Sequence, residues 1–256
     1  MSGLLQATGV SKSFAGIQAL RDVTLSVSAH QRVGLIGPNG AGKTTFFNCL
    51  LGVLAPDEGE VRFKGQELGG LPVSHRSRAG IGRTFQRIEL FDETSVFEHL
   101  FIAERVRNGS GAFWKDLLGL GRPKPAEIER CREMLDLLGL LPVADEPIEA
   151  LSLGQGRLVE VGRALMTNPE LLLLDEPSSG LDRTETAALA ATLQAVQAER
   201  GFAILLVEHD IELVADFTEY TYVLDFGTLI ADGPTSEVLD DPKVRASYLG
   251  TFEAHS

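Results

Sequence analysis

A glycine-rich segment at residues 37–45 has the residue types and spacing of a polyphosphate-binding loop. It matches the pattern G-x-x-x-x-G-K-[ST] through Gly37, Pro38, Asn39, Gly40, Ala41, Gly42, Lys43, Thr44 and Thr45. Backbone N–H groups in such a loop turn inward around phosphates, and the N-terminus of a following helix favours negative charge. We expect Lys43 to reach the β- and γ-phosphates of a nucleotide and the Thr44 hydroxyl to hold Mg²⁺. The alternative is a glycine-rich turn that matches the pattern by chance.

The segments that flank this loop are those that the motif requires. Residues 31–36 are short and apolar, as in a buried strand, and residues 44–51 are compatible with a helix that stops at Gly52. The order of strand, glycine loop and helix favours the phosphate-binding interpretation over a chance match.

Two neighbouring carboxylates end a second apolar segment, Leu171–Glu176. Neighbouring side chains on a strand point to opposite faces, so the two acids can have different roles. Ligands bind at the carboxyl ends of strands in open α/β sheets, where the phosphate loop also begins. We expect Asp175 to hold Mg²⁺, directly or through water, and Glu176 to orient and deprotonate the water that attacks the γ-phosphate. Without the upstream loop, surface acids capping a strand would explain the pair equally well.

The elements that must position these residues change in type along the chain. Strand-like runs near the N-terminus give way to a region without strand signals, from about residue 92 to 165, and strands then return. The segments expected to be strands are 9–14, 23–27, 31–36, 57–65, 171–175, 203–207, 221–224 and 228–231. The segments expected to be helices are 44–51, 96–106, 125–138, 158–166 and 184–199. This order predicts a parallel α/β sheet with a helical insertion and a small antiparallel layer near the N-terminus.

Composition and charge argue against several classes of protein. The chain has 256 residues, of which 44% are hydrophobic and 23% charged, as is typical of a folded soluble protein. No apolar run approaches the roughly 18 residues of a membrane span, and the N-terminus lacks a signal-peptide pattern, so we expect a cytoplasmic protein. The net charge of −13 argues against binding to nucleic acid or anionic lipid, so membrane attachment would go through another protein. We expect Cys49 and Cys131 to be core thiols rather than a disulfide.

Four further motifs accompany the phosphate loop and the carboxylate pair. They are Gln86, the pentapeptide Leu151–Gln155, the tetrapeptide Ser179–Asp182 and His209. In this order they resemble the motifs of the ATP-binding subunits of ABC transporters, over nearly the whole chain. The resemblance implies a P-loop NTPase (RecA-like) α/β core, an N-terminal antiparallel β layer and an inserted α-helical signature subdomain. It implies one ABC ATP-binding domain at 1–250, with its core at about 1–86 and 167–235, its helical subdomain at about 87–166, and a C-terminal tail at 236–256.

The signature-like pentapeptide has the clearest implied role among these motifs. In the family, Ser152, Gly154 and Gln155 would meet the γ-phosphate of a nucleotide at a helix N-terminus. A plain serine helix cap is the local alternative. Leu153 stands where the common signature has glycine, and we expect modest effects with intact ATP binding.

The remaining family positions are single residues. Gln86 resembles the glutamine that touches Mg²⁺ or the lytic water and links to the membrane subunit, and His209 matches the histidine that senses the γ-phosphate. Asp182 ends the tetrapeptide that looks like the D-loop. Phe14 has the place of the aromatic residue that stacks on adenine, with a core phenylalanine as the rival interpretation.

Other chemistry-bearing residues have no place in this pattern. Asp225–Gly227 spells a kinase Mg²⁺ motif, but no H-R-D-type loop precedes it, so we expect a hairpin turn between two strands. Trp114 is either an anchor of the helical subdomain or an exposed contact. Four histidines lack partners at ligand spacing and are expected at the surface: His30, His75, His99 and His255.

In the family two subunits pair head to tail, so that the signature serine of one closes over the ATP of the other. This chain has one phosphate loop and one signature and would supply half of each of two sites. The resemblance therefore implies a second ATPase subunit, related or identical, and transmembrane permease subunits. Closure around ATP and reopening after hydrolysis would drive the membrane partner. ABC proteins that act on ribosomes or chromosomes are disfavoured, because they normally carry two such domains or a long coiled coil.

The type of transporter is a narrower question. Arg83–Phe91 and Ala246–Gly250 resemble segments of branched-chain (hydrophobic) amino-acid importers, and the insertion at 107–125 resembles the larger of their two ATPases. Related urea or amide importers and lipid exporters share parts of this pattern and remain alternatives. The resemblance implies a location on the inner face of the cell membrane, where permeases and a substrate-binding protein choose the cargo.

Overall fold

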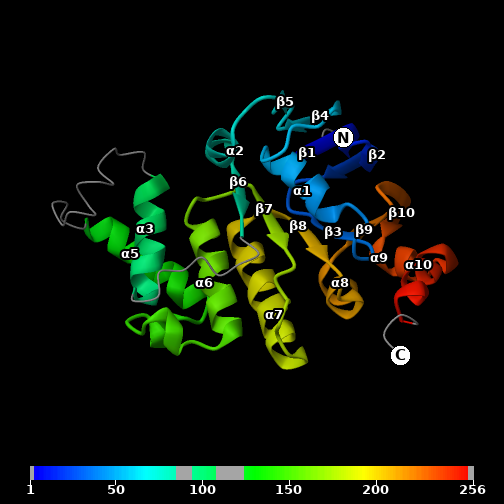
Figure 1. The fold of residues 1–256 in the computed structure, drawn as a ribbon. Coiled ribbons are helices and arrows are strands. Elements are labelled where there is room, and N and C mark those ends of the chain that lie inside the picture. The colour runs from blue at the N-terminus through cyan, green and yellow to red at the C-terminus, as the bar shows by residue number, and fades with distance from the viewer. Residues whose placement is uncertain (1–2, 85–93, 108–123, 253–256) are drawn as a thin grey trace.

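The chain folds into two β-sheets with helices packed around them (Figure 1). The computed structural model describes residues 3–84, 94–107 and 124–252, with side chains described as far as Ser247. No helix among these residues combines the length and the apolar character that a bilayer span needs.

The N-terminal sheet is antiparallel, with the strand order β2-β1-β4-β5. Its strands are β1 (Leu5–Phe14), β2 (Ile17–Val27), β4 (Glu58–Phe63) and β5 (Gln66–Glu67). Buried and exposed positions alternate over the second half of β2, because one face of the sheet packs on the core. Ala15 and Gly16, both with positive φ, turn the chain from β1 into β2 directly after Phe14.

The second sheet has the order β10-β9-β3-β8-β7-β6. Its strands are β3 (Arg32–Ile36), β6 (Ile81–Arg83), β7 (Leu171–Asp175), β8 (Ala203–Glu208), β9 (Tyr220–Asp225) and β10 (Thr228–Pro234). All neighbours pair in parallel except β10, which pairs antiparallel with β9. Strands β7 and β8 are buried along their whole length, which explains their continuous apolar sequences. The carboxyl ends of the parallel strands share one edge of the sheet.

Helices cover the sheets and extend the molecule to one side (Figure 1). They are α1 (Lys43–Leu51), α2 (Val73–Ala79), α3 (Val96–Arg107), α5 (Pro125–Leu137), α6 (Leu153–Leu165), α7 (Arg183–Arg200), α8 (Ile211–Phe217), α9 (Thr235–Asp240) and α10 (Pro242–Phe252), with short 3₁₀ turns at Leu141–Val143 and Ile148–Ala150. Helix α3 contacts both α5 and α6, all three drawn in green, and α6 reaches the sheet at β6.

Two hydrophobic cores lie on opposite faces of the six-stranded sheet. Leu171 and Leu173 of β7 belong to the core shared with α1 and the antiparallel sheet, whereas Leu172 and Leu174 belong to the core shared with α6, α7 and α8. Because side chains alternate along a strand, one apolar run holds both layers in place. The edge that carries the candidate site residues is thus fixed from two sides.

The observed architecture confirms the expected mixed α/β fold, with its antiparallel layer and its parallel sheet. The cysteines are buried and free, and Phe226 and Gly227 form the positive-φ turn between β9 and β10, as predicted. Helix α6 begins at Leu153, not near residue 158, because Ser152 and Gln155 cap its first turn. The three-residue strand β6 was not predicted, since Ile81–Arg83 is too short to show a strand pattern.

The histidines divide into two groups. His30 and His75 are exposed, as expected, and His255 lies outside the described residues. The expectation was wrong for His99, whose exposed fraction is 1%. It lies on the buried face of α3 with Val96 and Leu100, and its Nδ1 is 3.0 Å from the carbonyl oxygen of Ser95. Burial lowers the pKa of His99, which favours a neutral imidazole in this packing role.

Candidate functional site

The phosphate loop connects β3 to α1 at the carboxyl edge of the parallel sheet. Gly42 has a φ of 102°, and a Cβ there would lie 2.6 Å from the carbonyl oxygen of Ala19. At Gly37 a Cβ would lie 2.1 Å from the carbonyl oxygen of Leu224. These two glycines are required by close backbone packing, which holds the loop against β2 and β9.

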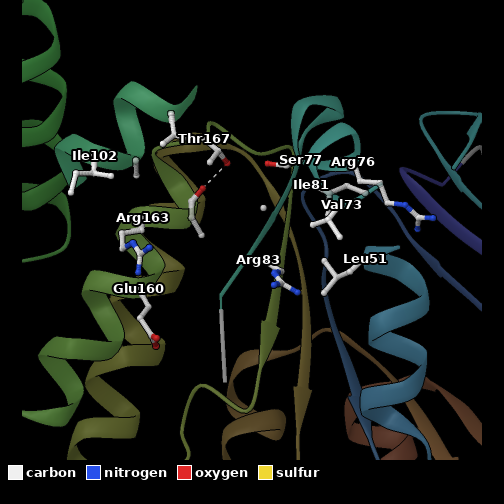
Figure 2. A pocket seen from close by; sticks show the side chains of 14 residues that line it. Leu51, Val73, Arg76, Ser77, Ile81, Arg83, Ile102, Glu160, Arg163 and Thr167 are labelled. Atoms are coloured by element: carbon white, nitrogen blue, oxygen red, sulfur yellow. Dashed lines mark hydrogen bonds between the residues drawn. The ribbon is translucent and has the colours of Figure 1, made fainter. Parts of the chain in front are cut away.

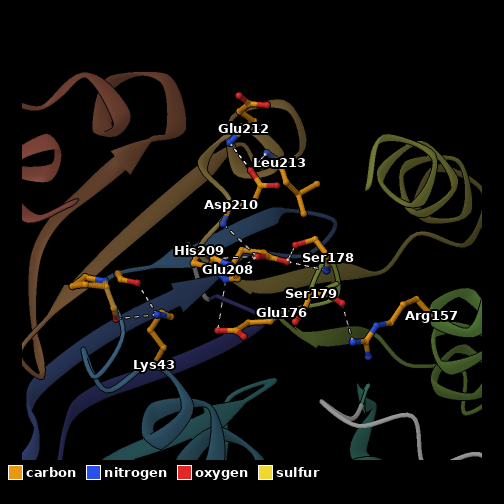
Figure 3. A network of polar contacts seen from close by, with 12 residues as sticks. Lys43, Arg157, Glu176, Ser178, Ser179, Glu208, His209, Asp210, Glu212 and Leu213 are labelled. Atoms are coloured by element: carbon orange, nitrogen blue, oxygen red, sulfur yellow. Dashed lines mark hydrogen bonds and ion pairs between the residues drawn. The ribbon is translucent and has the colours of Figure 1, made fainter. Parts of the chain in front are cut away.

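Lys43 folds back over this loop. Its Nζ donates to the carbonyl oxygens of Gly37 at 2.6 Å and Pro38 at 3.1 Å (Figure 3). Burial lowers the pKa of Lys43, and the nearby carboxylates of Glu176, Asp175 and Glu208 oppose that shift. An ammonium group held in a cradle of backbone groups can contact phosphate oxygens that enter the loop.

Asp175 ends β7 and is buried beside this charge. Its pKa is raised to about 6, chiefly by burial and next by the negative charge of Glu176, while Lys43 acts in the opposite direction. Its Oδ1 is buried and has no hydrogen-bond partner among the described residues. A buried carboxylate oxygen without a partner fits a ligand position for Mg²⁺, a cation that prefers oxygen ligands. Thr44, whose hydroxyl is expected from the motif to hold the same ion, is exposed in the first turn of α1.

Glu176 lies one residue beyond β7, in a left-handed conformation with a φ of 47°. The strand alternation expected for the two acids therefore stops at Asp175, and the backbone turn separates their side chains instead. The Glu176 N–H donates to the carbonyl oxygen of Val207 at 2.8 Å, which ties the turn to β8. Oε1 of Glu176 lies 3.9 Å from Nδ1 of His209. Both side chains are partly exposed, so water and a ligand can reach them.

Glu208 is a polar group that the sequence interpretation missed. It is the last residue of β8, directly before His209, and it is fully buried. The sequence does contain one signal for this residue: Glu208 is a single acid at the end of an apolar run that leads to the ligand-binding edge. Figure 3 shows it between Ser178 and the chain at His209 and Asp210.

The signature segment forms the N-terminus of α6. Ser152 Oγ accepts from the N–H of Gln155 at 3.2 Å, and the Gln155 side chain accepts from the N–H of Ser152 at 3.0 Å. The helix-cap interpretation is therefore realised, and it leaves Ser152 exposed at the surface. Asp182 caps α7 in the same way with Glu185. Within the part of the chain that the structure describes, these cap hydrogen bonds stay inside the first turn of each helix and do not reach the phosphate loop of the same chain.

Phe14 is 43% exposed, so the core interpretation of this residue is wrong. Its ring stands at the end of β1, with Nζ of Lys12 5.7 Å from the ring centroid. An exposed ring at this position remains available for stacking on a base. Two other sequence assignments, Gln86 and Trp114, lie outside the described residues.

A groove of about 300 Å³ lies beside the site, where α2 and β6 face α3 and α6 (Figure 2). Apolar side chains line it, among them Leu51, Val73, Ile81 and Ile102. Arg83, from the end of β6, lies within it in Figure 2. In the sequence, Gln86 follows Arg83 by three positions and lies outside the described residues.

Two protein-family models match the chain. One described as ABC transporter matches residues 20–179, and one described as branched-chain amino acid ATP-binding cassette transporter matches residues 228–254. The high-affinity branched-chain amino acid transport ATP-binding protein BraF of Pseudomonas aeruginosa is 37% identical over 250 residues, covering 96% of this chain and 98% of that protein. The lipopolysaccharide export system ATP-binding protein LptB of Haemophilus influenzae is 32% identical over 247 residues, covering 96% of this chain and 97% of that protein.

Solved structures match along nearly the same length. The ADP conformation of MJ1267, an ATP-binding cassette of an ABC transporter, has a TM-score of 0.87 and 32% identity, covering 98% of this chain and all (100%) of that one. The dimeric post-hydrolysis state of the ATP-binding cassette MJ0796, bound to ADP and Pi, has a TM-score of 0.74 and 25% identity, covering 90% of this chain and 98% of that one.

Proposed function

This chain belongs to the ATP-binding subunits of ABC transporters, and from that premise we propose that it hydrolyses ATP to energise the uptake of branched-chain or other hydrophobic amino acids. The observation that carries ATP hydrolysis is the convergence of Lys43, Asp175, Glu176 and His209 at one edge of the sheet. They come from three places, the loop after β3, the end of β7 and the loop after β8, and the parallel sheet brings these together.

In the proposed mechanism these residues divide the work. Lys43 and the loop N–H groups bind the β- and γ-phosphates, and Phe14 stacks on the adenine. Thr44, Asp175 and Gln86 hold Mg²⁺, which would neutralise phosphate charge when bound. Glu176 accepts a proton from the attacking water, and His209, within 3.9 Å of Glu176, contacts the γ-phosphate and keeps that carboxylate in place.

The site requires a second ATPase subunit for completion. Ser152 and Gly154 stand at an exposed helix N-terminus, where backbone N–H groups favour a phosphate. Their place is over the nucleotide of the partner, with Gln155 holding Ser152 and Asp182 placed at the same interface. A related subunit is favoured as that partner, and a second copy of this chain is the alternative.

The groove between α2, β6, α3 and α6 is the proposed contact with a transmembrane permease subunit. It is mostly apolar, and Arg83 at the end of β6 precedes Gln86 by three positions in the sequence, which supports communication between a permease bound in the groove and the catalytic edge. Attachment through a permease places the chain on the cytoplasmic face of the membrane. No contact with nucleic acid is part of this proposal, in keeping with the net charge of −13.

The choice of amino acids as cargo rests on the C-terminal match and on identity. Residues 228–254 match a model specific to branched-chain amino acid cassettes, and these residues include β10, α9 and α10. The amino-acid relative is also more similar than the lipopolysaccharide exporter, at 37% against 32% identity. Export of a lipid is the second candidate.

Isolation of the assembled transporter tests this proposal. The tagged chain is purified from its native membrane in detergent, its partners are identified by mass spectrometry, and ATP-dependent leucine uptake is measured after reconstitution in vesicles. Permeases, a second ATPase and a periplasmic amino-acid receptor are expected, with uptake lost in Lys43→Ala. Purification with lipid-extracting subunits, without leucine uptake, would replace amino-acid import by lipid export.

A further inference from the structure

Glu208 accepts hydrogen bonds from two loops at once. Its Oε1 accepts from the N–H of Ser178 at 3.0 Å and from the Ser178 hydroxyl at 2.6 Å. Its Oε2 accepts from the N–H of His209 at 3.0 Å and from that of Asp210 at 3.4 Å. The side chain is 0% exposed. Each carboxylate oxygen is therefore bound to a different loop (Figure 3).

The four hydrogen bonds that Glu208 accepts within the described residues come from three N–H groups and one hydroxyl, and Oε2 also lies 3.7 Å from Nδ1 of His209. A buried charge is unfavourable unless such donors compensate it, and here they do so at both oxygens. A glutamine of the same shape would have to turn its NH₂ group toward the N–H groups of one loop. The arrangement thus requires an acid, and it is sensitive to replacement by the isosteric amide.

The two loops serve the catalytic edge in different ways. One carries His209, whose Nδ1 is 3.9 Å from Oε1 of Glu176. The other begins at Ser178, two residues after Glu176, and runs to Asp182 at the start of α7. We call residues 178–182 the linker loop. Glu208 connects the backbone at His209, through Oε2, to the linker loop, through Oε1.

The linker loop continues this connection to the signature helix. The carbonyl oxygen of Ser179 accepts from Nη2 of Arg157, a buried residue of α6, at 3.3 Å. Gly180 has a φ of 85°, and a Cβ there would lie 2.9 Å from Cδ2 of Leu153. Leu153, which replaces the usual glycine, therefore packs on the linker loop beside Ser152. The connection runs from His209 to the N-terminus of α6 through direct contacts.

We propose that Glu208 is a positioning residue that couples the His209 loop to the linker loop, and through Arg157 and Leu153 to the signature at the start of α6. The inference rests on the proposed ATP site. Contact of His209 with the γ-phosphate in one site then sets how Ser152 is presented to the nucleotide of the partner subunit. The two halves that one chain contributes to two different sites are joined inside that chain.

Hydrogen exchange on the purified full chain tests this coupling. The parent carries Glu176→Gln, so that ATP is bound and not hydrolysed. Exchange at amides 178–182 and 152–156 is compared with and without Mg-ATP, at a chain concentration at which size-exclusion chromatography shows a monomer. We expect ATP to slow exchange in the linker loop by about tenfold in the parent. Adding Glu208→Gln should remove most of this slowing, while the Kd for ATP changes by less than about threefold.

Turnover gives a second readout. In the assembled transporter, Glu208→Gln alone should lower kcat about tenfold with KM for ATP within about twofold, a division that general destabilisation would not produce. Ser178→Ala should lower kcat less and add little to Glu208→Gln, because both changes break the same contact. Glu208→Asp keeps the charge but is one methylene shorter, so it should also lose the coupling, and it serves if the amide variant folds poorly.

Glu212→Gln is the matched control. It makes the same change of charge four residues along, at an exposed side chain that pairs with Arg183, and it should leave exchange and turnover unchanged. The inference would be overturned if ATP slowed exchange in Glu208→Gln as much as in the parent. It would also be overturned if Glu208→Gln lowered thermal stability and ATP affinity together with turnover, because that pattern indicates general destabilisation. Failure of the parent to bind ATP would refute the proposed function itself, whereas normal binding with an unaltered response refutes the coupling alone.

Discussion

The phosphate-loop edge and the signature segment of this chain differ in how their polar groups are satisfied. At the edge, Asp175 has a buried oxygen without a partner among the described residues, and Lys43 is held only by backbone carbonyl oxygens. At the signature, Ser152 and Gln155 satisfy each other in a helix cap and remain at the surface. The first region is arranged to receive a charged ligand from solution.

The difference indicates how the work is divided between subunits. Nucleotide and cation would compensate the buried charge at this edge and so stabilise the folded chain when they bind. The edge can therefore bind ATP within one chain. A signature whose polar groups are already paired gains contacts only when a second subunit brings a nucleotide to it. Binding is therefore expected to depend on the edge alone, and turnover on both regions.

The strongest test of this division is Glu176→Gln. Loss of the proton acceptor should lower kcat by about a thousandfold or more, because the attacking water loses its base. ATP binding should persist and trap the closed dimer, which size-exclusion chromatography with Mg-ATP detects. Normal turnover in this variant would refute the role of Glu176 as the base.

Lys43→Ala should act on binding itself. Removal of the ammonium group that faces the phosphates is expected to raise the Kd for ATP by about a hundredfold or more, measured by calorimetry on the isolated chain. Lys64→Ala is the control, since Lys64 makes an exposed ion pair with Glu170. Unchanged affinity in Lys43→Ala would contradict the phosphate-loop assignment.

Asp175→Asn tests whether the edge stores unfavourable charge. The folded-state pKa of Asp175, about 6, lies above the ordinary aspartate value of 3.8, so the ionised acid destabilises the nucleotide-free protein once the pH rises. The contribution of neutral Asp175 to the free energy of unfolding is fully present below about pH 4, and it is lost as the pH rises through 6. The asparagine variant should therefore gain about 3 kcal/mol of unfolding free energy at pH 7.5 and little near pH 4.

Denaturant unfolding at the two pH values, without nucleotide, measures this gain. The same variant should lose Mg²⁺-dependent hydrolysis, because the carboxylate that destabilises the folded chain is also the expected ligand for Mg²⁺. Equal stability of both proteins across the pH range would show that the carboxylate is compensated in the folded chain.

Ser152→Ala should give the smallest effect and the sharpest contrast between regions. We expect about a tenfold lower kcat in the assembled transporter and unchanged ATP affinity in the isolated chain, with about 1 kcal/mol lost from the helix cap. Ser95→Ala removes a comparable cap with Glu98 at α3 and controls for that loss. Equal turnover in both variants would mean that Ser152 is only a cap.

The order of strand and helix patterns predicted the mixed α/β fold class, which the structure confirms. The phosphate loop and the carboxylate pair are recognised from neighbouring residues alone, and their roles stay predictions. Phe14, by contrast, fits both a core and a surface position until the turn at Ala15 and Gly16 leaves it exposed. His99 was misassigned because a helix with weak amphipathic contrast does not reveal which face packs on α6.

The chemistry of the nucleotide site is local in the chain: a loop of nine residues and two adjacent acids are enough to identify it. Glu208 and its partner Ser178 are not local to each other, since Ser178 precedes Glu208 by 30 residues. They meet because β7 and β8 pair in parallel and end at the same edge, an outcome of strand register and packing. Short-range patterns predict which groups bind and cleave the nucleotide, and the pairing of distant strands determines which two loops Glu208 connects.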